Sequence, residues 1–167
     1  MLNSDLPDEE KSDARLGDEA QLILSAGLLT TSWALTVGSF HITASPLIHQ
    51  KLIEELQASG IGLTAARKWY KPAQLPYLHA VVRESIRLAY SLPHRNPRLS
   101  PDAEIRYNDW VILRNTPVSI TNLHVLLNED VFPSPTEFIP ERWIGNPGLE
   151  KYFVAFGKGS RACLGQE

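Results

Sequence analysis

The sequence predicts a mainly α-helical protein with a small β region in its second half. Residues 21–44 contain no Asp, Glu, Lys or Arg, and an apolar run of this length is typical of a long helix. Apolar side chains between residues 78 and 89 recur at helical spacing, and Pro93 follows that run. The 12 prolines and 10 glycines punctuate the chain, so we expect turns and short elements after the helices.

Residues 1–17 are polar and acidic, which predicts a solvated or flexible segment. We expect regular structure to begin near Asp18, because Asp18 and Gln21 have the spacing of a capping box. The uncharged run 21–44 also has the length of a membrane span. Its many hydroxyls and glycines make it too polar for a helix that faces lipid. We therefore expect a helix buried in a globular protein, and no membrane span.

A second helix is expected directly after the first. Ser45 and Pro46 have the pattern of an N-cap followed by the first helical residue. Leu52, Ile53 and Leu56 are expected on its buried face.

A third helix is expected from Pro76 to the residues before Pro93. Within it, Glu84 and Arg87 are three residues apart and therefore lie on one face, where they can pair. On an exposed helix such a pair contributes little to stability. The spacing of Glu84 and Arg87 alone therefore does not show whether the pair has a functional role.

The β region is expected to begin with a hairpin. Residues 105–107 and 110–113 flank Asn108-Asp109, a plausible two-residue turn. Residues 116–121 could add another strand, and residues 123–127 a short helix.

Composition excludes some classes of function. The formal net charge is −3, so nothing indicates a nucleic-acid partner. The chain has one cysteine, which excludes an internal disulfide.

That cysteine lies in residues 156–165, a stretch that reads Phe-Gly-Lys-Gly-Ser-Arg-Ala-Cys-Leu-Gly. The glycines permit positive φ angles and a close approach of the backbone to a flat partner. Lys158 and Arg161 add positive charge, which favours the thiolate of Cys163 over its thiol. A buried, inert cysteine in a glycine turn is the alternative interpretation.

The spacing of this loop resembles the haem-binding loop of cytochrome P450. The matching positions are Phe156, Gly157, Gly159, Arg161, Cys163 and Gly165. The resemblance implies that the Cys163 thiolate is the axial ligand of the haem iron, that Phe156 and Gly157 contact the cofactor, and that Arg161 meets a haem propionate. An arginine at the place of Arg98 commonly meets a propionate in that family.

Residues 26–31 resemble the oxygen-binding segment of the same family. The resemblance implies that Ala26 and Gly27 let the helix pass close to the haem, and that Thr30 positions dioxygen and helps to deliver protons. Leu29 departs from the pattern, because the family usually has Asp or Glu there, and leucine cannot relay a proton. A helical threonine can also bond only to its own preceding turn.

Glu84 and Arg87 resemble the family's Glu-x-x-Arg motif, and Arg142 lies in a matching Pro-Glu-Arg segment. The resemblance implies a buried network of Glu84, Arg87 and Arg142 that fixes the meander before the haem loop. These residues would support the cofactor pocket and would not be catalytic.

The resemblance covers residues 18–167 and implies the C-terminal part of the cytochrome P450 fold: a long central helix, the Glu-x-x-Arg helix, β hairpins, a meander and the Cys haem loop. Family members are longer, so we expect a partial domain that is truncated at both ends. Much of the apolar surface of the central helix should then be exposed.

Three functions remain open at this point. The first is a haem-dependent monooxygenase, resembling fungal members, that inserts one atom of O2 into a small organic substrate. Its cofactors would be haem b and, through NADPH-cytochrome P450 reductase, NADPH. The second is a truncated, inactive fragment without a stable haem site. The third is a haem-thiolate enzyme that uses peroxide or rearranges its substrate, because Leu29 replaces the acidic residue. A full-length eukaryotic parent is expected at the endoplasmic reticulum membrane.

Overall fold

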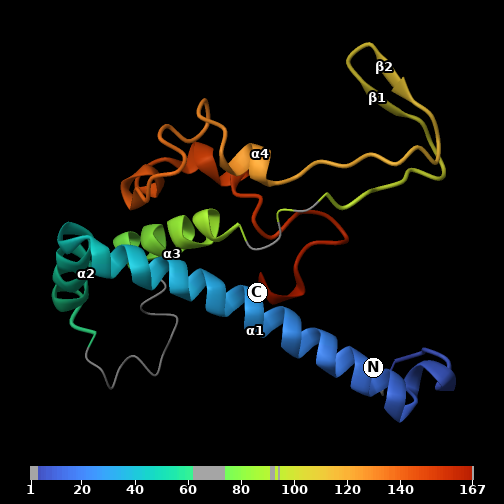
Figure 1. Cartoon of the computed structure of the whole chain (residues 1–167), viewed down its shortest axis with the longest axis horizontal. Coiled ribbons are helices and arrows are strands. Elements are labelled where there is room, and N and C mark those ends of the chain that lie inside the picture. The colour runs from blue at the N-terminus through green and yellow to red at the C-terminus, as the bar shows by residue number, and fades with distance from the viewer. Residues whose placement is uncertain (1–3, 62–73, 91–92, 94, 167) are drawn as a thin grey trace.

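One long helix, α1 (Asp13–Ala44), runs the length of the helical part of the molecule (Figure 1). The shorter helices α2 (Pro46–Ala58) and α3 (Pro76–Ala89) pack against it and against each other. A hairpin of β1 (Ile105–Tyr107) and β2 (Trp110–Ile112) and the short helix α4 (Leu123–Leu126) follow. The computed structural model describes residues 4–61, 74–90, 93 and 95–166. The mainly helical fold class with a small β region is confirmed.

Helix α1 begins earlier than the sequence indicated. A 3-10 turn, η1 (Asp8–Lys11), precedes it, and the Ser12 side chain accepts a hydrogen bond from the Arg15 backbone N–H at 3.4 Å. The expected start at Asp18 is therefore wrong, because the N-cap is Ser12. Much of the stretch 1–17 that was expected to be flexible is helical, although residues 1–3 lie outside the described ranges.

The expectation that α1 is buried is also wrong, since Gly38 is its one buried residue. Most large apolar side chains along the helix are exposed by half or more, and Leu24 and Leu28 by 72% and 70%. This agrees with the expectation that apolar surface of the central helix is left uncovered. By length and composition alone α1 could cross a membrane, but core helices of soluble proteins pass the same test, so one such helix is weak support for a span.

The core lies where α2 and α3 meet. Ile48 and Leu52 of α2 pack with Tyr77 and Val81 of α3 in one buried cluster. Ser45 caps α2 as expected, by accepting from the Ile48 backbone N–H at 3.4 Å. The buried face was only partly predicted: Ile53 and Leu56 lie on the exposed side, whereas Ile48 is buried.

Helix α3 has no capping side chain at its own N-terminus. Glu55 of α2 supplies one instead, because its two carboxylate oxygens accept from the backbone N–H groups of Tyr77 at 2.7 Å and Leu78 at 2.9 Å. A carboxylate there satisfies two N-terminal donors and complements the positive end of the helix dipole. This contact fixes the start of α3 against α2.

Helices α1 and α3 are in close contact at Gly38. A Cβ added at Gly38 would lie 2.6 Å from the Ser85 Oγ and 3.2 Å from the Ser85 Cβ. That hydroxyl is held in place, because it donates to the Val81 carbonyl at 2.7 Å. The glycine is therefore required by the packing of the two helices.

We expect Gly38→Ala to lower the free energy of unfolding by about 1–3 kcal/mol, because the added methyl group overpacks this contact. Gly17→Ala is the matched control in the same helix, since nothing lies within 4 Å of a Cβ at Gly17. The control should gain about 0.5–1 kcal/mol from helix propensity. Urea denaturation followed by circular dichroism measures both changes. Equal stabilisation by the two substitutions would contradict the close contact.

The β hairpin projects away from the helices (Figure 1). Its strands are antiparallel and pair Ile105 with Ile112 and Tyr107 with Trp110. Asn108 adopts a positive φ of 51° in the turn, as the Asn108-Asp109 pattern predicted. Among the described residues, the expected strand at 116–121 is reduced to one bridge between Arg98 and Val118.

After α4, the described residues 127–166 contain three 3-10 turns and little other regular structure. They are η4 (Pro140–Trp143), η5 (Pro147–Tyr152) and η6 (Leu164–Gln166). The first of them packs against α3. This packing brings the segment between α4 and the Cys163 loop, residues 127–155, to the buried face of α3, and this segment is called the meander below.

Candidate functional site

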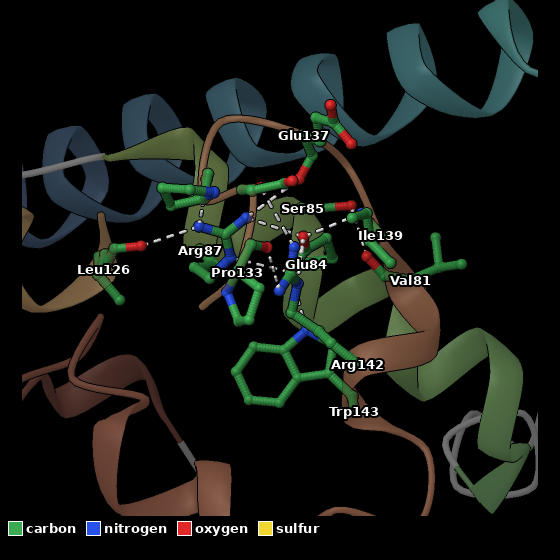
Figure 2. Close-up of polar contacts among 12 residues, drawn as sticks. Val81, Glu84, Ser85, Arg87, Leu126, Pro133, Glu137, Ile139, Arg142 and Trp143 are labelled. Carbon is green, nitrogen blue, oxygen red and sulfur yellow. Dashed lines mark hydrogen bonds and ion pairs between the residues drawn. The ribbon is translucent and has the colours of Figure 1, made fainter. Parts of the chain in front are cut away.

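Glu84 and Arg87 form a bidentate ion pair inside the molecule. Both side chains lie on the buried face of α3 and are 0% exposed. The Arg87 Nε donates to Glu84 Oε2 at 2.9 Å, and its Nη2 donates to Oε1 at 2.8 Å. The same guanidinium also donates to the carbonyls of Leu126, Pro135 and Glu137 at 2.9, 2.7 and 3.2 Å. Arg87 thus joins α3 to the chain that follows α4 (Figure 2).

The meander supplies three more donors to Glu84. Arg142 Nε donates to Oε1 at 3.1 Å, and the indole N–H of Trp143 donates to Oε2 at 2.9 Å. The backbone N–H of Ile139 donates to Oε1 at 3.0 Å. Figure 2 shows Ile139, Arg142 and Trp143 around the Glu84 carboxylate. The structure therefore brings Glu84, Arg87 and Arg142 together, with Trp143 as a fourth member that the sequence did not indicate.

These contacts keep Glu84 ionised despite its burial. Burial alone would raise the pKa of the carboxyl, because it disfavours the charged form. The hydrogen bonds and charge of Arg87, with the donors at Ile139 and Trp143, outweigh that effect, so the pKa of Glu84 lies below its ordinary value of 4.5. A carboxylate with five donors is strongly preferred over the neutral acid.

The lowered pKa of Glu84 predicts a loss of stability in acid. Its contribution is present above the unfolded-state pKa of 4.5 and is lost as the pH falls through the lower folded-state pKa. We expect the difference in free energy of unfolding between the native chain and Glu84→Gln to shrink as the pH falls from 6 to 3. Glu141, whose pKa is also lowered, is present in both proteins and cancels from the difference. A difference that stays constant over this range would contradict the prediction.

The loop that carries Cys163 is closed by backbone hydrogen bonds. The Cys163 N–H donates to the Phe156 carbonyl at 2.9 Å, and the Ala162 N–H donates to the Gly159 carbonyl at 3.0 Å. Gly157 and Gly159 adopt positive φ angles of 70° and 80°, which other residues rarely adopt. Cys163 is a free, exposed thiol, and Arg161 is exposed beside it. The tight loop expected from the glycines is thus present.

A groove of about 580 Å³ lies between α3 and this loop. Its walls come from α3, from η5 and from the Cys163 loop. The lining residues are His79, Val82, Arg83, Ile86, Glu150, Phe153, Phe156, Gly157, Lys158, Gly159, Ala162 and Gln166.

Thr30 lies in α1 and bonds to its own helix. Its Oγ1 donates to the Ala26 carbonyl at 2.7 Å. Leu29 is 67% exposed, and nothing lies within 4 Å of a Cβ built at Gly27. Within the described ranges, no hydrogen bond joins Thr30 to the Cys163 loop. The structure therefore places the expected oxygen-binding segment on an open helix surface.

The two arginines expected at the propionates are both exposed. The backbone of Arg98 pairs with Val118, by hydrogen bonds of 2.8 and 2.9 Å in the two directions. Arg161 follows the two glycines of the Cys163 loop. In the part of the chain that the structure describes, neither side chain makes an ion pair.

A second polar cluster was not anticipated from the sequence. Lys51 of α2 pairs with Glu141 of η4 at 2.6 Å, and the Tyr77 hydroxyl donates to the same carboxylate oxygen at 3.2 Å. Burial, and then the neighbouring charge of Glu141, raises the pKa of Tyr77 to about 12. The three residues are far apart in the chain, and no local spacing indicates that they meet.

Comparisons with known proteins agree on one family. The family model described as Cytochrome P450 matches residues 1–167. The chain is 44% identical over 172 residues to the cytochrome P450 monooxygenase sdnE of Sordaria araneosa, covering 99% of this chain and 33% of the relative. It is 41% identical to the cytochrome P450 monooxygenase MO6277 of Ascocoryne sarcoides, with 99% and 33% covered. It is 42% identical to the cytochrome P450 monooxygenase astB of Talaromyces wortmannii, with 99% and 35% covered. The chain thus spans about a third of the length of these relatives.

Proposed function

The chain belongs to the cytochrome P450 family, and from that premise we propose that it carries the iron-binding part of a haem-thiolate monooxygenase, with Cys163 as the axial ligand. The longer protein would insert one atom of O2 into a small organic substrate. The observation that carries the proposal is the free, exposed Cys163 on a closed loop with two positive-φ glycines.

The residues of this loop fit a haem iron by the chemistry of the donor. A thiolate is a strong ligand for iron, and Cys163 is a free, exposed cysteine on this loop. When bound, the haem supplies oxygen activation, and thiolate ligation favours O–O cleavage. The glycines at 157 and 159 leave the backbone without side chains that would obstruct a flat macrocycle.

Other residues would hold and orient what binds beside the loop. Arg161 and Arg98 present exposed guanidinium groups, which suit the carboxylates of haem b propionates. Nothing lies within 4 Å of a Cβ built at Gly27, so Gly27 and Ala26 would leave room on α1 for a close approach. The Thr30 hydroxyl uses its proton in the bond to Ala26, and its oxygen can still accept a hydrogen bond. Leu29 offers no titratable group to supply a proton.

Reducing equivalents would come from NADPH through a P450 reductase, and a full-length parent would act at the endoplasmic reticulum membrane. The named relatives are fungal monooxygenases, which favours a substrate from fungal secondary metabolism. These assignments extend the family membership to the activity of full-length relatives, about a third of whose length this chain spans.

The proposal is tested by the spectrum of the haem-loaded chain. The chain is expressed with haem available, reduced and exposed to carbon monoxide, and the Soret band is recorded. A red-shifted band characteristic of thiolate ligation is expected. A spectrum of free haem, or of histidine-ligated haem, would contradict the proposal for this chain and favour the alternative of an inactive fragment. The exposed apolar surface of α1 is the observation that supports that alternative.

A further inference from the structure

We propose that Arg83 is a positioning residue for the Cys163 loop. It acts by fixing a row of aromatic side chains that leads from the buried Glu84 network to the Phe156 carbonyl. The inference rests on the proposed function for the role of Cys163, but its structural content concerns only described residues of this chain.

Arg83 lies on α3 directly before Glu84, and its side chain is 19% exposed. Its guanidinium carbon lies 5.0 Å from the Phe153 ring centroid and 5.6 Å from the Trp143 ring centroid. A guanidinium is planar and can contact aromatic faces while it keeps its charge. Arg83 therefore links α3 to two aromatic side chains of the meander at once.

Two polar contacts set the orientation of the guanidinium. Arg83 forms an ion pair with Glu150 of η5, and its Nε donates to the Nε2 of His79 at 3.1 Å. His79 accepts this bond only when Nε2 carries no proton. The Arg83 side chain is thus held by a contact from α3 and by a contact from the meander. Its guanidinium therefore has a fixed position against the rings of Trp143 and Phe153.

The aromatic row connects this position to the cysteine loop. Trp143 meets Phe153 edge-on, with centroids 5.4 Å apart and an interplanar angle of 81°. Phe153 meets Phe156 in the same way, at 5.9 Å and 75°. Edge-to-face pairs at these separations are favourable and directional. Phe156 is the last ring of the row, and its carbonyl accepts the hydrogen bond from the Cys163 N–H.

The row is anchored at its other end by the Trp143 indole, which donates to Glu84. Removal of Arg83 would leave that anchor in place but would free Phe153 from α3. The Phe156 carbonyl would then be less well fixed, and the loop hydrogen bond to Cys163 would open more often. Arg83 lines the same groove as Phe156 and Gly157.

Amide hydrogen exchange of the chain without haem tests the inference directly. In Arg83→Met, the Cys163 amide should exchange about tenfold faster, because two cation–π contacts, the ion pair with Glu150 and the hydrogen bond to His79 are lost. The Leu88 amide, within α3, should be unchanged. Arg83→Lys keeps the charge toward Glu150 but loses the planar contacts with the rings. The exchange rate of its Cys163 amide should therefore lie between those of the native and Arg83→Met chains. Arg106→Met, which removes an exposed hairpin cation that pairs with Glu104, is the matched control and should have no effect.

Two outcomes would overturn the inference: equal exchange of the Cys163 amide in native and Arg83→Met chains, or equal acceleration at Cys163 and Leu88. If Arg83→Met does not fold, the exchange of the Cys163 and Leu88 amides is compared between the native and Arg83→Lys chains instead. In the haem-loaded chain, Arg83→Met should also lower the fraction of thiolate-type Soret band about threefold or more. If the native chain itself shows no such band, the proposed function fails, while the exchange experiment still decides the role of Arg83.

Discussion

Replacement of Cys163 by alanine should abolish the thiolate-type Soret band of the reduced, carbon monoxide-bound chain. Cys163 is the only cysteine, so no other side chain can supply a thiolate. Its side chain is exposed and carries no buried contact, so the free energy of unfolding should change by no more than about 0.5 kcal/mol. Loss of the band can therefore be separated from loss of the fold by parallel denaturation curves.

Ser160→Ala is the control for this experiment, because it alters an exposed side chain of the same loop and removes no thiol. It should keep the band at the position seen for the native chain. Survival of the band in Cys163→Ala would show that the ligand assignment is wrong. A band lost equally in both variants would show that the loop is disturbed by any substitution.

The second large effect is expected in the buried network. Arg87→Met should lower the free energy of unfolding by about 3–5 kcal/mol, because it leaves the Glu84 carboxylate buried with part of its charge uncompensated. Arg87 also satisfies three carbonyls, and those acceptors would lose their donors. Chemical denaturation followed by Trp fluorescence measures the change, since Trp143 lies in the network.

A double-mutant cycle makes this prediction sharper. The double variant with Glu84→Met and Arg87→Met should lose less free energy of unfolding than the two single variants lose in sum, because neither charge is then buried without its partner. Arg106→Met, with an exposed partner at 3.5 Å, should change stability by no more than about 0.5 kcal/mol. Additive effects at Glu84 and Arg87 would contradict the coupling that the bidentate geometry implies.

The sequence predicted those elements whose signals are local. The Ser45-Pro46 start of α2, the apolar spacing of α3 and the Asn108-Asp109 turn each depend on residues within a few positions of one another, and each was found. The start of α1 was missed because Asp18 and Gln21 have the spacing of a capping box, whereas the true cap, Ser12, is followed three residues later by Arg15. Burial of α1 was also mispredicted, since apolar composition alone does not show what covers a helix.

The contacts that organise the candidate site are mostly non-local. The i, i+3 spacing of Glu84 and Arg87 could be seen in the sequence, and the resemblance added Arg142. Neither indicated that Glu55 caps α3, or that Arg83 contacts Trp143 and Phe153. These contacts depend on how the meander packs against α3, and no short sequence pattern predicts that packing.

Glu84 also constrains the order in which this chain can acquire its structure. Its partners Ile139, Arg142 and Trp143 lie 55, 58 and 59 positions further along the chain. During synthesis, α3 is complete long before those donors exist, and Glu84 must stay hydrated until they arrive. Closing so long a loop has an entropic cost that precedes the gain from the contacts. The final packing of α3 is therefore a late event that requires the chain to have been made at least to Trp143.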